Sequence, residues 1–87
     1  MRQQITEEQV KAAVEKVIEK LYYRLEQKGF GTFSSRHEIL GVMTEEYNEL
    51  VEAVHTNNHQ EMREELLDLA VGAIFSVACL DQRTVDW

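Results

Sequence analysis

The sequence contains no proline, only four glycines and a single cysteine among 87 residues. Proline and glycine interrupt helices most often, so their scarcity favours long helices that are broken only where residues 29–31 read Gly-Phe-Gly. The single cysteine, Cys79, excludes an intramolecular disulfide framework, and its apolar surroundings indicate a buried thiol in a reducing compartment. We therefore expect an all-α protein of the cytoplasm.

Long apolar segments are also missing. The first residues lead into a polar stretch instead of the apolar core of a secretory signal. The longest mainly apolar stretch, residues 66–80, contains Asp68 and Gly72 and is too short to cross a bilayer. We expect neither a secretory signal nor a membrane partner.

Basic residues are few, with nine Lys and Arg against sixteen Asp and Glu and a net charge of −7. Binding to a nucleic acid backbone needs clustered Lys and Arg, so nucleic acid is not an expected partner. All four lysines lie at or before Lys28, whereas residues 38–68 hold nine carboxylates and one arginine, Arg63. An acidic surface of this kind would need a cation in order to handle an anion.

Apolar residues recur at intervals of three and four and predict a first helix over residues 7–28. Thr6 and Gln9 are expected to form its capping box, and Gly29 is expected to end it. Ser35 and Asn58 are the predicted caps of helices over residues 36–55 and 59–80, and residues 81–87 form a tail.

The short connections predict antiparallel packing of these helices in a single domain, residues 1–87. A chain of this length leaves much of its surface exposed, and the third helix is apolar nearly all round from residue 66 to residue 80. We expect a hairpin core that is completed into a four-helix-type bundle in a homodimer or a dimer of dimers. A monomer with the third helix at its centre is the alternative.

Two acidic pairs at helical spacing dominate the acidic segment. Glu46 and Glu49 lie in the second predicted helix, and Glu65 and Asp68 lie in the third. Residues at i and i+3 share a helix face, so a hairpin would bring the four carboxylates together. Four like charges repel unless a divalent cation binds or their pKa values rise, and oxygen-only ligands favour Mg²⁺ or Mn²⁺. The alternative is a solvated acidic surface.

Two further expectations follow from this placement. Glu64 is expected on a flanking stripe of the third helix, outside the site. Neutralising one charge of the repelling group, as in Glu49→Gln or Asp68→Asn, is expected to leave the metal-free fold equally or more stable.

The pattern Glu-Glu-x-x-Glu from Glu45 to Glu49, a fifteen-residue spacer, and Glu-x-x-Asp from Glu65 to Asp68 resembles the signature of the MazG-like all-α NTP pyrophosphohydrolases. That superfamily includes dimeric dUTPases and phosphoribosyl-ATP pyrophosphatases. The resemblance covers about residues 35–80 and implies Mg²⁺ ligation by Glu46, Glu49, Glu65 and Asp68. It also implies that Glu45 assists a second ion or orients water. The implied reaction converts a nucleoside triphosphate to the monophosphate and pyrophosphate in nucleotide-pool house-cleaning.

The residues that would bind the substrate depart from the pattern of that family. Relatives often place a basic residue followed by Asn upstream of the acidic pair, where this sequence reads Arg36-His37-Glu38. Either Arg36 contacts phosphate after a small shift, with His37 at the basic position, or nucleotide handling differs, or activity is weak. Arg63 is a second phosphate candidate, and Phe33 either plugs the end of the helices or stacks on a base. The alternative function is an inactive homologue that acts as a regulatory or protein-interaction dimer.

Overall fold

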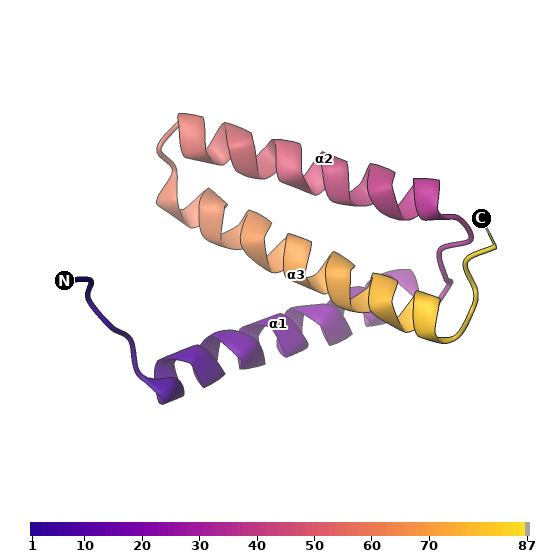
Figure 1. The fold of residues 1–87 in the computed structure, drawn as a ribbon, viewed down its shortest axis with the longest axis horizontal. Helices are drawn as coiled ribbons and strands as arrows, with labels where there is room; N and C mark the ends of the chain where they lie inside the picture. The colour runs from indigo at the N-terminus through magenta and orange to yellow at the C-terminus, as the bar shows by residue number, and fades with distance from the viewer. Residues whose placement is uncertain (87) are drawn as a thin grey trace.

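The computed structural model describes residues 1–86 and contains three helices, α1 (Glu7–Lys28), α2 (Arg36–His55) and α3 (His59–Asp81), shown in Figure 1. The predicted all-α class is confirmed, since these residues form no strand, and α3 is one residue longer than predicted. Trp87, the end of the predicted tail, lies outside the described residues. None of the three helices has the length and apolar character needed to cross a membrane.

Side chains cap the N-terminus of each helix. Thr6 and Gln9 form the predicted capping box, with hydrogen bonds of 3.1 Å to the Thr6 hydroxyl and 2.8 Å to the Gln9 amide oxygen. The side chains of Ser35 and Asn58 each accept a hydrogen bond of 3.0 Å from the backbone N–H three residues later. Helix α1 ends at Gly29, whose φ of 83° is accessible to glycine without steric cost. Local sequence therefore sets the helix boundaries.

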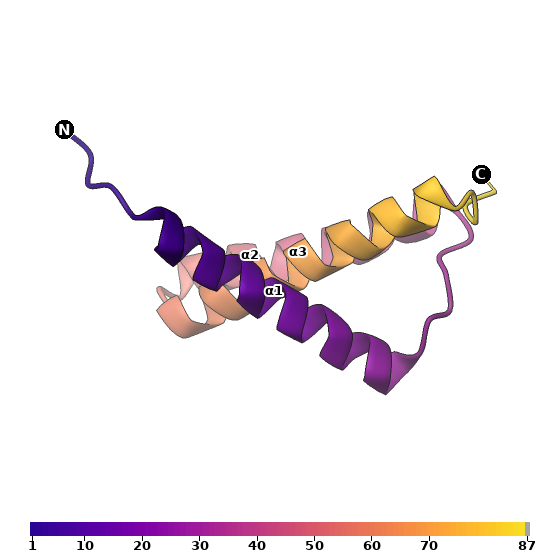
Figure 2. The ribbon, with the colours of Figure 1, turned by 90° about the horizontal axis from the view of Figure 1, so that it is seen from below.

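Helices α2 and α3 lie antiparallel as a hairpin, and α1 crosses α3 obliquely on the other side (Figures 1 and 2). Within residues 1–86, α3 is the helix that packs against both of the others. A tight turn joins α2 to α3, and Asn57 adopts a positive φ of 56° there. An extended segment, residues 29–35, joins α1 to α2. The fold therefore places α3 between two neighbours.

The C-terminal segment is tied to the connection between α1 and α2. The hydroxyl of Thr84 donates to the carbonyl oxygen of Phe33 at 3.2 Å, and the backbone N–H of Asp86 donates to the carbonyl oxygen of Ser34 at 2.8 Å. These contacts hold the connection against the segment that follows α3, residues 82–86, and the two segments lie side by side in Figure 1.

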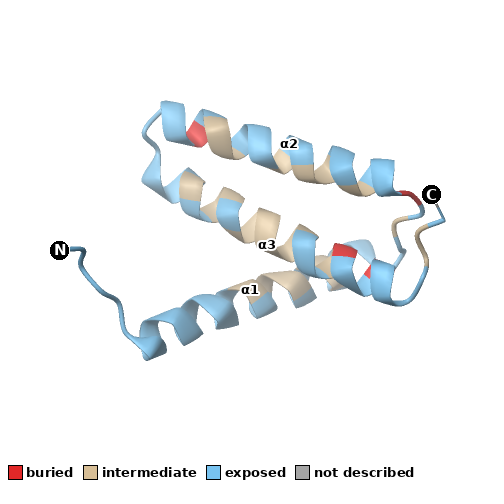
Figure 3. Cartoon of the chain, in the orientation of Figure 1, coloured by how far each residue is buried: buried red, intermediate tan, exposed pale blue. Residues whose placement is uncertain are grey.

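Few residues are buried in this arrangement (Figure 3). The buried residues among those described are Ala53, Cys79, Ser35 and Ser76. The accessible surface is 7062 Å², whereas a compact protein of this mass exposes about 5,300 Å² by the usual scaling. Large apolar side chains are exposed on α1 and α3, among them Val10, Val14, Ile18, Leu66, Ile74, Val77 and Leu80. The three helices leave apolar surface that a single chain does not cover.

Candidate active site

Three glutamates form an acidic cluster between α2 and α3. One carboxylate oxygen each from Glu46, Glu49 and Glu65 lies within 4.8 Å of the other two. Glu46 and Glu49 share a face of α2 because they are three residues apart, and the hairpin places Glu65 of α3 opposite them. Glu46 and Glu65 are partly buried, while Glu49 is exposed. The structure thus brings together three of the four predicted metal ligands.

The carboxylates of the acidic cluster lie in an electrostatically unfavourable environment. Atom Oε2 of Glu46 and Oε2 of Glu65 are both buried and accept no hydrogen bond from the described residues. The pKa of Glu65 is raised to about 7, chiefly by burial, then by a hydrogen bond with Glu49 and by the neighbouring carboxylate charges. Burial, followed by the charges of Asp68 and Glu49, also raises the pKa of Glu46. The cluster therefore favours binding of protons or of a cation.

The donor set fits a hard divalent cation. All three groups supply carboxylate oxygens, and two of those oxygens are buried without a partner. Mg²⁺ and Mn²⁺ prefer such ligands, and the ion would relieve the repulsion that raises the two pKa values. A hollow of about 520 Å³ gives access to the cluster, and its lining residues are Glu49, Glu52, Ala53, Thr56, Asn58, Glu61 and Glu65.

Asp68, the fourth predicted ligand, is held by two cations of α1. Its Oδ1 lies 2.8 Å from Nζ of Lys20 and 2.9 Å from Nη2 of Arg24, and its side chain is only 14% exposed. Nζ of Lys20 also lies 3.1 Å from Oε2 of Glu64. Burial alone would lower the pKa of Lys20, but hydrogen bonds and charge from Asp68 and Glu64 raise it above 10.5. Asp68 is therefore part of an ion-pair network.

These contacts correct one prediction. The acidic segment was expected to be without nearby lysines, yet Lys20 reaches it from the first helix. Glu64 lies outside the acidic cluster of Glu46, Glu49 and Glu65, as expected, but it shares Lys20 with Asp68. Sequence reasoning missed the cations, although Lys20, Arg24 and Lys28 recur every four residues and so share one face of α1. This regular spacing of basic residues was the sequence signal that could have predicted a cationic face on α1.

A cavity of about 260 Å³ lies between the C-terminal half of α1 and the hairpin. Its polar lining consists of Arg24 and Lys28 from α1, Glu46 from α2 and Asp68 from α3. The rest of its lining is apolar or glycine: Leu21, Leu25, Gly29, Gly31, Phe33, Val42, Val71, Gly72 and Phe75. Glu46 therefore belongs both to the wall of this mainly apolar cavity and to the acidic cluster, so the cavity adjoins the cluster.

Phe33 forms part of the wall of this cavity. Its ring packs edge-on against Phe75 of α3, with ring centroids 5.4 Å apart and an interplanar angle of 87°. The sequence left open whether Phe33 closes the end of the helices or stacks on a base. The contact with Phe75 fixes the ring in the wall, and this position allows the ring to meet a ligand in the cavity.

The remaining predicted site residues lie outside the cavity. Arg36 and His37 are exposed in the first turn of α2, about 15 Å along the helix axis from the acidic cluster at 1.5 Å per residue. Arg63 is directed to Glu64, with the two side chains 3.7 Å apart. Glu45 is exposed beside the cluster. The structure does not bring the three basic candidates to the site.

The family comparison agrees with the carboxylate pattern. Residues 34–86 match the model of the MazG nucleotide pyrophosphohydrolase domain. The match spans α2 and α3 and leaves out α1. Comparison with curated proteins and with solved structures gave no match. Because the matched residues make up more than half of the chain and contain the whole acidic cluster, the chain belongs to the MazG nucleotide pyrophosphohydrolase domain family.

Proposed function

We propose that this protein is a Mg²⁺-dependent nucleoside triphosphate pyrophosphohydrolase that releases pyrophosphate and a nucleoside monophosphate. The acidic cluster of Glu46, Glu49 and Glu65 is the observation that carries the proposal, because two of its oxygens are buried without a partner. The cavity beside Glu46 offers space for part of a nucleotide. Membership in the family supports the reaction class.

Each acidic residue has a proposed role. Glu46, Glu49 and Glu65 would hold the metal, with Asp68 as a fourth carboxylate beside them. A bound Mg²⁺ or Mn²⁺ supplies charge neutralisation and Lewis acidity at the triphosphate. Glu45, exposed next to the cluster, is placed to orient the attacking water or to assist a second ion. The apolar walls of the cavity would exclude water around the rest of the nucleotide.

We further propose that the functional unit is a homodimer or a dimer of dimers. The accessible surface of 7062 Å² exceeds that of a compact chain of this mass. Exposed apolar side chains on α3, such as Ile74 and Val77, would be covered by a second copy. A bundle of four-helix type would result at this surface.

An inactive homologue that serves as a regulatory or protein-interaction dimer is the second candidate. The engagement of Asp68 by Lys20 and Arg24 favours it, because this carboxylate is already neutralised without a metal. The exposed positions of Arg36 and His37 favour it as well, since neither reaches the cavity. Both candidates share the fold and differ in chemistry.

Pyrophosphate release separates the two candidates. A panel of NTPs and dNTPs is incubated with Mg²⁺, with Mn²⁺ or with chelator, and pyrophosphate is quantified. We expect metal-dependent release that falls about 100-fold or more in Glu49→Gln, because a ligand of the metal is lost. Glu26→Gln, at an exposed position of α1, is the matched control and should keep wild-type activity. Absence of release from every nucleotide, or equal activity in the two variants, would reject the enzymatic proposal.

A further inference from the structure

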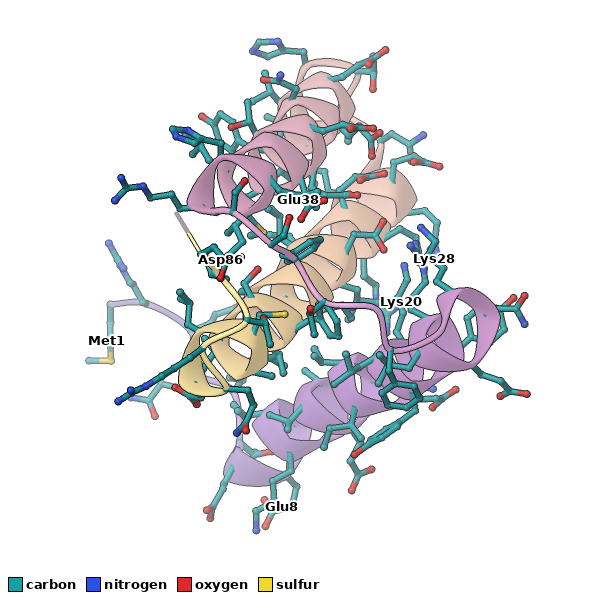
Figure 4. The ribbon with its side chains drawn as sticks, turned by 90° about the vertical axis from the view of Figure 1, so that its right-hand side faces the viewer. Met1, Glu8, Lys20, Lys28, Glu38 and Asp86 are labelled. Atoms are coloured by element: carbon teal, nitrogen blue, oxygen red, sulfur yellow. The ribbon has the colours of Figure 1, made fainter. Side chains whose placement is uncertain are left out.

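Helix α1 carries a cationic stripe, Lys20, Arg24 and Lys28, that faces the hairpin. The three residues recur every four positions and so lie on one side of the helix. Figure 4 shows the labelled Lys20 and Lys28 side chains pointing from α1 toward the α2–α3 hairpin. Arg24 and Lys28 line the cavity that also contains Glu46 and Asp68. The stripe lies outside residues 34–86, the part of the chain that matches the family.

The cationic stripe lies against the acidic site, and its Lys20 side chain is more buried than lysine side chains usually are. The Lys20 side chain is 19% exposed, and its amine lies within 3.1 Å of both Asp68 and Glu64. Arg24 makes a second contact with the same oxygen of Asp68 at 2.9 Å. Lysine is rarely buried unless it is paired, so these cations depend on the carboxylates for as long as no other anion is present.

A triphosphate would change that balance. The proposed metal site is built from Glu46, Glu49 and Glu65, and its negative charge repels phosphate oxygens that are not bound to the metal. Cleavage between the α and β phosphates also builds negative charge on the leaving pyrophosphate. Among the described residues that line the cavity, Arg24 and Lys28 are the cationic ones, and Lys20 lies one turn from Arg24.

We propose that Lys20 and Arg24 exchange partners when substrate binds, an inference that rests on the proposed pyrophosphohydrolase function. Without metal and nucleotide they neutralise Asp68. With both present, Asp68 joins the metal site, and Lys20, Arg24 and Lys28 contact the β and γ phosphates that leave as pyrophosphate. The stripe of α1 is then the leaving-group site, on a helix distinct from the metal-binding hairpin.

Partner exchange predicts effects of opposite sign on two ligands. A cation that holds Asp68 competes with metal alone, so its removal strengthens metal binding. The same cation attracts pyrophosphate once the metal is bound, so its removal weakens pyrophosphate binding. Removal of a residue that only supports the fold would weaken the binding of both ligands or of neither.

The test uses the full chain, with Mn²⁺ alone and with inorganic pyrophosphate at saturating Mn²⁺ as probes, both followed by calorimetry. Lys20→Gln and Arg24→Gln should each bind Mn²⁺ more tightly than wild type and should bind pyrophosphate about tenfold more weakly, the usual scale for a lost charge-assisted hydrogen bond. Arg24→Lys keeps the charge and should stay close to wild type for both probes.

Lys16→Gln is the matched control. Lys16 lies one turn before Lys20 but is directed to Glu19 at 3.7 Å, and its side chain is 56% exposed. Its loss removes the same charge and should change neither affinity. Far-ultraviolet circular dichroism reports whether each variant is folded at the assay temperature.

The outcomes separate this inference from the proposed function. If wild type binds Mn²⁺ and hydrolyses nucleotides, but Lys20→Gln and Arg24→Gln shift both affinities in the same direction or leave pyrophosphate binding unchanged, partner exchange is wrong and the enzymatic proposal stands. If wild type binds no Mn²⁺ and releases no pyrophosphate, the proposed function fails and the inference fails with it.

Discussion

Glu46 of α2 and Glu65 of α3 face each other across the hairpin, with carboxylate oxygens within 4.8 Å, and each buries Oε2 without a hydrogen-bond partner among the described residues. Two carboxylates placed in this way repel each other when both are ionised. Burial is the main reason that both pKa values are raised. The metal-free protein consequently carries a destabilising element at the centre of its proposed site.

The stability of the metal-free protein should fall as pH rises from about 4.5 through about 7. The pKa of Glu65 is about 7 in the fold against 4.5 ordinarily, so the folded state binds this proton more tightly than the unfolded chain. The contribution is fully present below pH 4.5 and is lost as pH passes through 7, and the raised pKa of Glu46 acts in the same direction.

Urea unfolding in chelator at pH 5 and pH 8 measures this difference. Glu65→Gln should reduce it, because the side chain no longer titrates, whereas Glu26→Gln on the exposed surface should retain it. An unchanged pH dependence in Glu65→Gln would show that the acidic cluster does not control stability in this range.

Mg²⁺ or Mn²⁺ should raise the melting temperature at pH 8, and chelator should reverse the effect. The ion relieves repulsion in the acidic cluster and stabilises the folded state by mass action, by about 2.7 kcal/mol when free metal exceeds its Kd a hundredfold. The gain should be smaller at pH 5, because Glu65 must lose its proton before it binds a metal. If added metal changed the melting temperature at neither pH value, with or without nucleotide, the main support for the metal site would be lost.

Asp68→Asn and Glu49→Gln should both lower pyrophosphohydrolase activity about 100-fold or more, but only Asp68→Asn should destabilise the metal-free protein. Asp68→Asn removes the counter-charge of Lys20 and Arg24, so we expect a loss of about 1–3 kcal/mol. Glu49→Gln removes a repelling charge and should leave the fold equally or more stable. The sequence alone predicted the second outcome for both variants.

Chemical unfolding in chelator compares these two variants with wild type. If Asp68→Asn were as stable as Glu49→Gln, the ion pairs across α1 and α3 would contribute nothing in solution, and the partner exchange would have no starting state. Glu64 is unsuitable as a neutral control for this experiment, because it lies 3.1 Å from Lys20.

The protein should have about twice the 10.1 kDa mass of one chain, or four times, in solution. Val77 is 55% exposed on α3, and Val77→Glu should shift the mass toward that of the monomer by placing a charge in the apolar contact. Gln3→Glu adds the same charge in the segment before α1 and should have no effect. Light scattering after size-exclusion chromatography measures the mass, and a wild-type monomer at micromolar concentration would contradict the prediction.

Much of the hairpin was accessible from sequence because its determinants are local. Ser35 and Asn58 cap the helices that they were predicted to cap, since the hydrogen bond reaches only three residues along the chain. The short turn at residues 56–58 obliges α2 and α3 to lie antiparallel. Spacing of three residues then places Glu46 and Glu49 on one face opposite Glu65.

The partners of Asp68 were decided by the tertiary structure. Spacing placed Asp68 one turn from Glu65, but it could not show that Arg24, 44 residues away in the sequence, would form an ion pair with Asp68. The segment before α2, residues 29–35, is extended and leaves the direction of α1 open to packing. Helical periodicity fixes which side chains share a face, whereas the charge opposite that face depends on how two distant helices cross. The sequence by itself thus determined the helices and the faces that carry the four carboxylates, and only the crossing of α1 over α3 determined that Asp68 is the one neutralised by cations.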